Sequence, residues 1–168
     1  MRILGVDPGL RVTGYGAIEC AAGTMRLVEA GTIAPDVRSP LERRLGQLHA
    51  EVCAVLDATV PDVMVVEELW TAYKNPTTAV LMGHARGVIC LAANAKGVRL
   101  RHLAHSHVKR ALTGSGAARK EQVKRMVMLQ LALTARPEPD DVSDALALAL
   151  ALVNIERAEL RLGRLGIA

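Results

Sequence analysis

Short apolar runs alternate along this chain with longer segments whose apolar residues recur at helical spacing. The short runs are of strand length, contain β-branched residues and end at turn residues, so each predicts a β-strand. The predicted strands cover residues 2–6, 12–19, 25–33, 63–66 and 98–101. The first three follow one another with only short turns between them, which predicts an antiparallel meander.

The longer segments predict helices. The first helix follows Ser39-Pro40-Leu41-Glu42, a capping box with Pro at the first helical position, and its apolar residues continue to Leu56. Further helices are predicted at residues 75–96, 106–112, 117–133 and from about residue 140 onward. In the helix at 75–96, Gly83 and Gly87 lie four residues apart and leave room for another backbone to approach closely.

The segment from residue 145 to residue 152 alternates between Ala and Leu, a pattern that a strand can also show. Ala and Leu are strong helix formers, and no β-branched residue follows until Val153, so this segment predicts a helix buried on every side. No internal repeat or linker divides the sequence. We therefore expect a single α/β domain over residues 1–168.

The composition is that of an ordinary globular protein, with 168 residues of which 51% are hydrophobic and 23% charged. A formal net charge of +4 favours an anionic partner without identifying one. The three cysteines are far apart, so we expect reduced thiols. No stretch reaches the roughly 18 uncharged apolar residues that a membrane span requires, and we expect a cytoplasmic protein.

Acidic residues stand at the ends of predicted elements. Asp7 follows the first predicted strand, Glu67 follows the strand at 63–66, and Asp141 and Asp144 share one face in the first turn of the last helix. Taken singly, Asp7 is typical of a turn, and acids in a first helical turn complement the helix dipole. Taken together, two strand ends and one helix start can bring these acids to one edge of the sheet.

Such a cluster favours a multivalent cation. Like charges about 4 Å apart repel by roughly 4 kcal/mol at an effective dielectric constant near 20. Oxygen ligation without His or Cys favours Mg²⁺ or Mn²⁺ over zinc. Two such ions activate water and stabilise a leaving oxygen, so phosphodiester hydrolysis is the chemistry that the pattern predicts.

Several motifs follow one another in order along nearly the whole chain. They are Ile-Leu-Gly-Val-Asp-Pro-Gly-Leu-Arg-Val-Thr-Gly-Tyr-Gly at 3–16, Val66-Glu67 followed by Trp70, Gly-His-Ala-Arg-Gly-Val at 83–88, Val108-Lys109, Gly114-Ser115-Gly116, Lys120, and Asp-Val-Ser-Asp-Ala-Leu-Ala at 141–147. In these motifs the chain resembles the RuvC family of Holliday junction resolvases. The resemblance implies a ribonuclease H-like α/β fold, with a mixed five-stranded sheet flanked by helices.

The resemblance also assigns the acids. The residues in the family's catalytic and metal-binding positions are Asp7, Glu67, Asp141 and Asp144. Successive strand residues point to opposite faces, so only one of Glu67 and Glu68 can join the cluster, and the motif favours Glu67. Asp140 is expected to be a helix N-cap.

Basic and aromatic residues are expected to contact DNA. By resemblance, Lys109 and Lys120 lie near the scissile phosphate or the DNA backbone, and Trp70 stacks on or wedges between bases at the junction. Lys124 shares a helical face with Lys120, and with Arg110 they predict a basic surface that binds phosphate without reading sequence.

Three histidines lie beside this basic segment, namely His102, His105 and His107. They lack the thiolates and spacing of a zinc site, so we expect solvated or DNA-facing imidazoles.

The resemblance implies a homodimer that cuts a symmetric four-way DNA junction with Mg²⁺, or Mn²⁺ in its place, and that collaborates with the RuvA and RuvB branch-migration proteins. Two alternatives remain open: another ribonuclease H-like nuclease acting on RNA or structured duplex, and a junction-binding protein without activity. An actin-like or sugar-kinase-like ATPase requires a second related domain and a second phosphate motif, and the sequence has neither. The preferred cleavage sequence and the preferred ion stay undetermined at this point.

Overall fold

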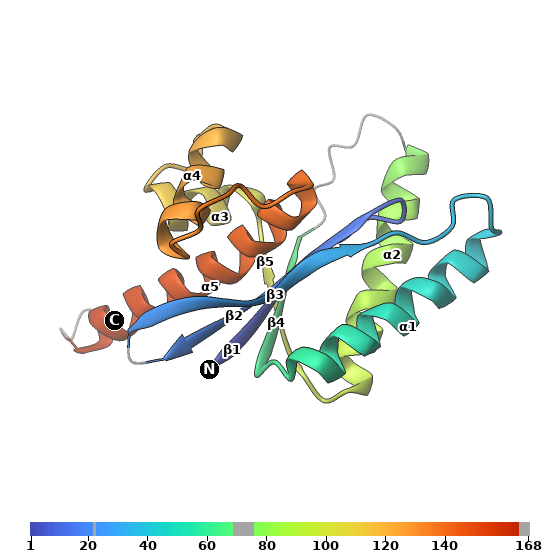
Figure 1. The fold of residues 1–168 in the computed structure, drawn as a ribbon, viewed down its shortest axis with the longest axis horizontal. Coiled ribbons are helices and arrows are strands. Elements are labelled where there is room, and N and C mark those ends of the chain that lie inside the picture. Colours follow the sequence, from blue (N-terminus) through green and yellow to red (C-terminus); the bar gives the residue numbers. More distant parts are fainter. Residues whose placement is uncertain (22, 69–75, 165–168) are drawn as a thin grey trace.

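The computed structural model describes residues 1–21, 23–68 and 76–164, and its ribbon is shown in Figure 1. The elements in chain order are β1 (Arg2–Asp7), β2 (Thr13–Ala21), β3 (Thr24–Ile33), α1 (Leu41–Thr59), β4 (Val63–Glu67), α2 (Pro76–Ala95), β5 (Arg99–Leu103), α3 (His105–Thr113), α4 (Lys120–Gln130) and α5 (Asp140–Arg164). Among the described residues, no helix combines the length and the apolar character needed to cross a membrane.

The strands form one five-stranded sheet in the order β3-β2-β1-β4-β5. β1, β2 and β3 pair antiparallel as the predicted meander, whereas β4 pairs parallel with both β1 and β5. Tight turns connect antiparallel neighbours, while parallel neighbours need a longer crossover, which α1 and α2 supply here. The expected mixed five-stranded sheet is confirmed.

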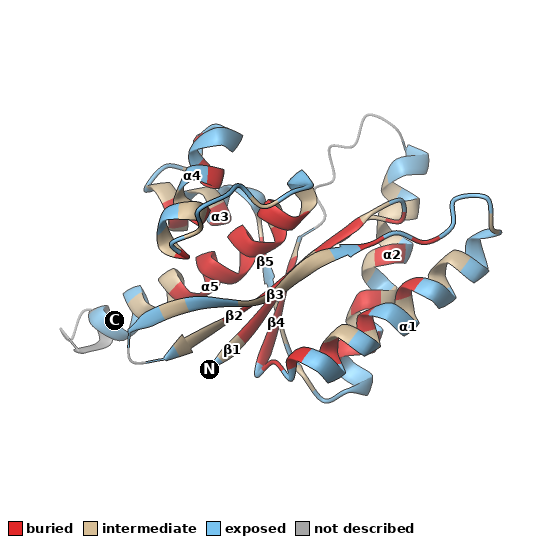
Figure 2. Cartoon of the chain, in the orientation of Figure 1, coloured by how far each residue is buried: buried red, intermediate tan, exposed pale blue. Residues whose placement is uncertain are grey.

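Helices cover both faces of the sheet (Figure 1). Along β1, Leu4 and Val6 belong to the core formed with α1 and α2, while Ile3 belongs to the core formed with α3, α4 and α5. β4 alternates in the same way: Val65 belongs to the core formed with α3, α4 and α5, and Val66 belongs to the core formed with α1 and α2. Figure 2 shows these central strands as buried between the two helical layers.

α5 lies across the sheet and is the most deeply buried helix of the described chain (Figure 2). All residues from Ala145 to Val153 are at most 3% exposed, which confirms the predicted helix that is apolar on every side. Glycines in the strands below allow this close packing. A Cβ at Gly5 would lie 1.9 Å from the Ala145 carbonyl oxygen, and one at Gly14 would lie 2.1 Å from the Asp141 carbonyl oxygen.

Two predicted helix starts differ from the structure. α1 begins at Leu41 without any side-chain cap, because the Ser39 hydroxyl lies 3.4 Å from the Asp36 carboxylate instead of bonding the helix backbone. The expected capping box is therefore wrong. α4 begins at Lys120 and not at residue 117, because turn contacts around Ser115 hold the preceding residues, including the Ala118 amide, outside the helix.

Candidate active site

The two strand-end acids are neighbours in the sheet. β1 and β4 pair in parallel register up to Val6 opposite Val66, so Asp7 and Glu67 are the next residues of adjacent strands. Both continue the alternation of Ile3 and Val65, which face α5. The sheet therefore turns both carboxylates toward the helix that carries the other two acids.

Gly14 allows the start of α5 to lie next to Asp7. Gly14 pairs with Asp7 in the register of β1 and β2, and an added Cβ there would lie 2.9 Å from the Asp141 Cβ. The absence of a side chain at this position lets the first turn of α5 rest on β2 beside Asp7. Asp144, one turn further along α5, faces the pocket that Asp7 and Glu67 line.

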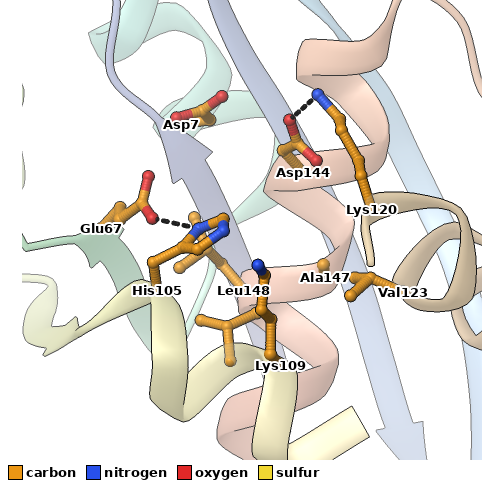
Figure 3. A pocket seen from close by; sticks show the side chains of 10 residues that line it. Asp7, Glu67, His105, Lys109, Lys120, Val123, Asp144, Ala147 and Leu148 are labelled. Carbon is orange, nitrogen blue, oxygen red and sulfur yellow. Dashed lines mark hydrogen bonds and ion pairs between the residues drawn. The ribbon is translucent and has the colours of Figure 1, made fainter. Parts of the chain in front are cut away.

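Both charged and apolar side chains line this pocket, which is shown in Figure 3. Its polar lining residues are Asp7, Glu67, His105, Lys109, Lys120 and Asp144, and its apolar ones are Val108, Val123, Ala147 and Leu148. Asp141 does not line the pocket, although its charge acts on Asp7. Three of the predicted acids thus surround one cavity, and the fourth, Asp141, lies outside it next to Gly14.

Burial and mutual repulsion change the acidity of the cluster. Burial, followed by the charges of Glu67, Asp144 and Asp141, raises the pKa of Asp7 to about 7. Lys120 acts in the opposite direction and only partly offsets these effects. Without a cation, Asp7 therefore keeps its proton to a much higher pH than an ordinary aspartate, and a bound cation would favour its charged form.

Lys120 supplies the positive charge next to this cluster. Its ammonium lies 2.8 Å from Asp144 Oδ2 and 3.4 Å from Asp140 Oδ2 (Figure 3 shows the Asp144 contact). Burial acts to lower the pKa of Lys120, but the hydrogen bond to Asp144 and the attraction of both aspartates raise it above its ordinary value. Lys109 also lines the pocket, and within the described chain no carboxylate forms an ion pair with it.

The structure corrects two expectations about neighbouring residues. Lys124 is only 4% exposed, and its ammonium bonds Asp140 Oδ1 at 2.5 Å, so it is not part of an exposed basic surface with Lys120. Asp140 is the first residue of α5, not its N-cap. Its carboxylate forms ion pairs with Lys124, Lys120 and Arg136. The hydrogen bond from Lys124 is the main reason that the pKa of Asp140 lies below its usual value.

Two residues that hold Glu67 were not predicted from the sequence. His105 Nδ1 lies 2.7 Å from Glu67 Oε1, and Arg86 Nε donates to the Glu67 carbonyl oxygen at 3.0 Å. Arg86 also reaches His102 Nδ1 at 2.7 Å, which ties α2 to β4 and β5. Neither contact has a signal in the sequence, because the residues involved are 19 and 38 positions from Glu67.

Arg110, another predicted DNA contact, and Glu68, the neighbour of Glu67, do not line the pocket within the described chain. Arg110 is exposed in the last turn of α3. Glu68 is exposed, and its amide donates to the Leu103 carbonyl, which agrees with Glu67 being the inward acid. Trp70 lies outside the described residues, so its predicted role at the junction stays a prediction.

The donor set suits a hard divalent cation. Asp7, Glu67 and Asp144 offer only carboxylate oxygens, which Mg²⁺ and Mn²⁺ prefer. Burial, followed by the neighbouring acids, raises the pKa of Asp7, and a bound cation would offset both effects. Within the described chain, however, no three acidic, His or Cys side chains are arranged closely enough to hold one ion as they stand. The Asp144 carboxylate is instead paired with the Lys120 ammonium at 2.8 Å.

The chain is similar to proteins of one family. The model of the family described as Crossover junction endodeoxyribonuclease RuvC matches residues 3–152. A relative of that name from Rhodopirellula baltica is 45% identical over 148 residues, 88% of this chain and 83% of the relative. The structure of Thermus thermophilus RuvC gives a TM-score of 0.86 at 33% identity, covering 95% of this chain and 97% of that chain. T. thermophilus RuvC in complex with Holliday junction substrate gives a TM-score of 0.85 at 31% identity, with coverages of 94% and 96%. The chain therefore belongs to the RuvC family of crossover junction endodeoxyribonucleases.

Proposed function

We propose that this protein resolves four-way DNA junctions by paired symmetric nicks, through metal-dependent hydrolysis of phosphodiester bonds, in recombination and DNA repair. The observation that carries the proposal is the meeting of Asp7, Glu67 and Asp144, with Asp141 behind them, at one edge of the sheet beside Lys109 and Lys120. Membership of the RuvC family, one of whose structures is described as a complex with Holliday junction substrate, supports the choice of DNA.

The acids have the role of metal ligands in this proposal. Asp7, Glu67, Asp141 and Asp144 would hold the ions, which we propose are two Mg²⁺ per site with Mn²⁺ able to replace them. Bound there, such ions would activate the attacking water and stabilise the negative charge on the leaving oxygen. Water adds to phosphorus, one P–O ester bond breaks, and the departing oxygen takes up a proton.

The basic residues position the DNA. Lys109 lines the pocket without a carboxylate partner in the described chain, so its charge is available to the scissile phosphate. Lys120 is half exposed and can exchange Asp144 for a phosphate oxygen. Arg110 is exposed in the last turn of α3, where it contacts the DNA backbone further from the pocket. Trp70 stacks on bases. Lys124 is excluded from this set by its burial.

Two copies of the chain, each one nuclease domain over residues 1–168, form the active unit in this proposal. α2 presents Val80, His84, Gly87 and Leu91 along one exposed face, with Val80 and Leu91 each 58% exposed. A Cβ at Gly87 would meet no atom of the described residues within 4 Å, so this face has room for a second helix. RuvA and RuvB are the branch-migration partners that family membership suggests.

Cleavage of an end-labelled, branch-migratable junction and of a matched linear duplex in Mg²⁺ tests the proposal. We expect paired nicks on the junction, little cutting of the duplex, and loss of cutting in Asp7→Asn. Asp57→Asn is the matched control, because Asp57 is an exposed acid of α1 that pairs with Lys96 far from the pocket. This variant should cut as the wild type does.

Other outcomes separate the alternatives. Junction binding without cutting in Mg²⁺ or Mn²⁺ would replace the proposal with a junction-binding protein. Equal cutting of junction and duplex, or a preference for RNA, would indicate a different nuclease of the same fold.

A further inference from the structure

Glu67 is held at two points by different elements. Arg86 of α2 donates to its main-chain carbonyl at 3.0 Å, which fixes the end of β4. His105, the first residue of α3, contacts its side chain, with Nδ1 2.7 Å from Oε1. Figure 3 shows the imidazole beside the Glu67 carboxylate, with one carboxylate oxygen turned toward the ring and the other turned away from it.

The direction of this hydrogen bond follows from the chemistry of the pair. An ionised carboxylate only accepts hydrogen bonds, so Nδ1 of His105 carries the hydrogen and donates it to Oε1. Among the described residues no other side chain bonds to Glu67, so its Oε2 is left available. The contact therefore occupies one oxygen of Glu67 and leaves the other for a ligand in the pocket.

Glu67 needs such a restraint more than Asp7 does. Its longer side chain is 29% exposed, while Asp7 has a shorter side chain whose burial already dominates the environment of its carboxyl. A glutamate loses more rotamer freedom than an aspartate when it is ordered, so a free Glu67 would have to be ordered at the moment a metal binds. The hydrogen bond from His105 orders it beforehand.

We propose that His105 is a positioning residue that acts through Glu67: it restrains the carboxylate at the edge of the pocket, so that Glu67 loses less conformational freedom when a divalent cation binds. The proposal rests on the proposed function of the four acids as metal ligands. It gives His105 a role different from the DNA-facing imidazole expected from the sequence, and it separates His105 from His107, which lies two residues further along α3.

Partners that orient metal ligands typically contribute 10- to 100-fold to metal affinity or activity. We therefore expect His105→Ala to weaken Mn²⁺ binding about tenfold or more in the absence of DNA. His105→Asn should recover most of the affinity, because its amide nitrogen can donate from nearly the position of the imidazole Nδ1. The His105 side chain is 67% exposed, so neither change should alter the melting temperature of the metal-free protein.

Titration of free Mn²⁺ by electron paramagnetic resonance measures this affinity directly. His107→Ala is the matched control, since His107 is an exposed histidine of the same helix with no side-chain partner in the described chain, and it should bind Mn²⁺ as the wild type does. In junction cleavage, His105→Ala should need about tenfold more Mn²⁺ for half-maximal rate while approaching the wild-type rate at saturation.

The Asp7→Asn variant distinguishes the two proposals. If wild type and Asp7→Asn bind Mn²⁺ equally, the acids are not the metal site, and the role of His105 is overturned together with it. If Asp7→Asn loses Mn²⁺ while His105→Ala keeps wild-type affinity, the metal site stands and only the role of His105 is overturned. Failure of His105→Asn to recover affinity would also contradict the proposed hydrogen bond.

Discussion

Asp7 ends β1 in a place where an ionised carboxylate is unfavourable, because it is buried and surrounded by Glu67, Asp144 and Asp141. Its pKa rises from 3.8 to about 7, so the folded protein binds a proton there more tightly than the unfolded chain does. The stability from this proton is fully present below about pH 4 and is lost as the pH rises through about 7. Without a divalent cation, the folded protein is therefore strained at this point under neutral and alkaline conditions.

Asp7→Asn removes that strain, because asparagine is neutral at every pH. In EDTA at pH 8 we expect the variant to have a free energy of unfolding higher than the wild type by roughly 2 to 4 kcal/mol, given about 1.4 kcal/mol per pKa unit. The difference should shrink steadily toward pH 4. Urea unfolding followed by circular dichroism across this range measures it, and a difference independent of pH would contradict the assignment.

The sequence indicated that the acids would meet at one edge of the sheet, but not which residues would contact them. Asp7 and Glu67 were predicted because each ends an apolar run, and strand alternation decided between Glu67 and Glu68. Lys124 was misplaced because its burial depends on Asp140, 16 positions away, whose carboxylate draws the ammonium inward. The contact of His105 depends on where α3 begins relative to β4, which no local pattern encodes.

At the scale of elements, the position of α5 depends on small residues in the strands beneath it. Gly14 pairs with Asp7 in the sheet and touches the backbone of Asp141 across the layer, so it sets the separation of the acids. The sequence predicted the strands and α5 well, because apolar run length and helix propensity are local properties. It did not predict that this glycine determines the spacing of the site.

Gly14→Ala should move the first turn of α5 away from β2, because the added Cβ would lie 2.1 Å from a backbone oxygen that cannot rotate aside. We expect a loss of about 1 to 3 kcal/mol in stability and of about 100-fold in junction cleavage, since small displacements in a catalytic site have large effects on rate.

Gly46→Ala is the control for this change. Gly46 lies within α1 with nothing within 4 Å of the position of an added Cβ, and alanine favours helix by up to about 1 kcal/mol. It should leave cleavage unchanged and stability equal or higher. Thermal unfolding and single-turnover cleavage of both variants measure the two effects. Equal losses at the two glycines would contradict the close packing of α5 on Gly14 as their cause.

At the scale of the whole molecule, the ribonuclease H-like arrangement of a mixed sheet between two helical layers is confirmed. The layer of α1 and α2 covers the face of the sheet opposite α5, the helix that carries Asp141 and Asp144 (Figure 1). In the proposed dimer, the second subunit therefore packs on a surface that does not overlap the pocket.

Leu91→Glu tests this arrangement by placing a charge on the exposed face of α2. We expect a wild-type dimer by analytical ultracentrifugation and a monomer for the variant, because a carboxylate buried at an apolar interface lacks a partner. Leu129→Glu alters a leucine of α4 that is 64% exposed and should keep the wild-type mass. A variant Leu91→Glu that remains dimeric would place the dimer contact elsewhere.

The location of the acids along the chain also bears on when the protein becomes active. Asp141 and Asp144 are synthesised more than 130 residues after Asp7 and reach it only when α5 docks on Gly14. A nascent chain still on the ribosome contains the sheet acids but not the helix that completes the site. If the four acids act as proposed, translation must pass α5 before the site can cut DNA.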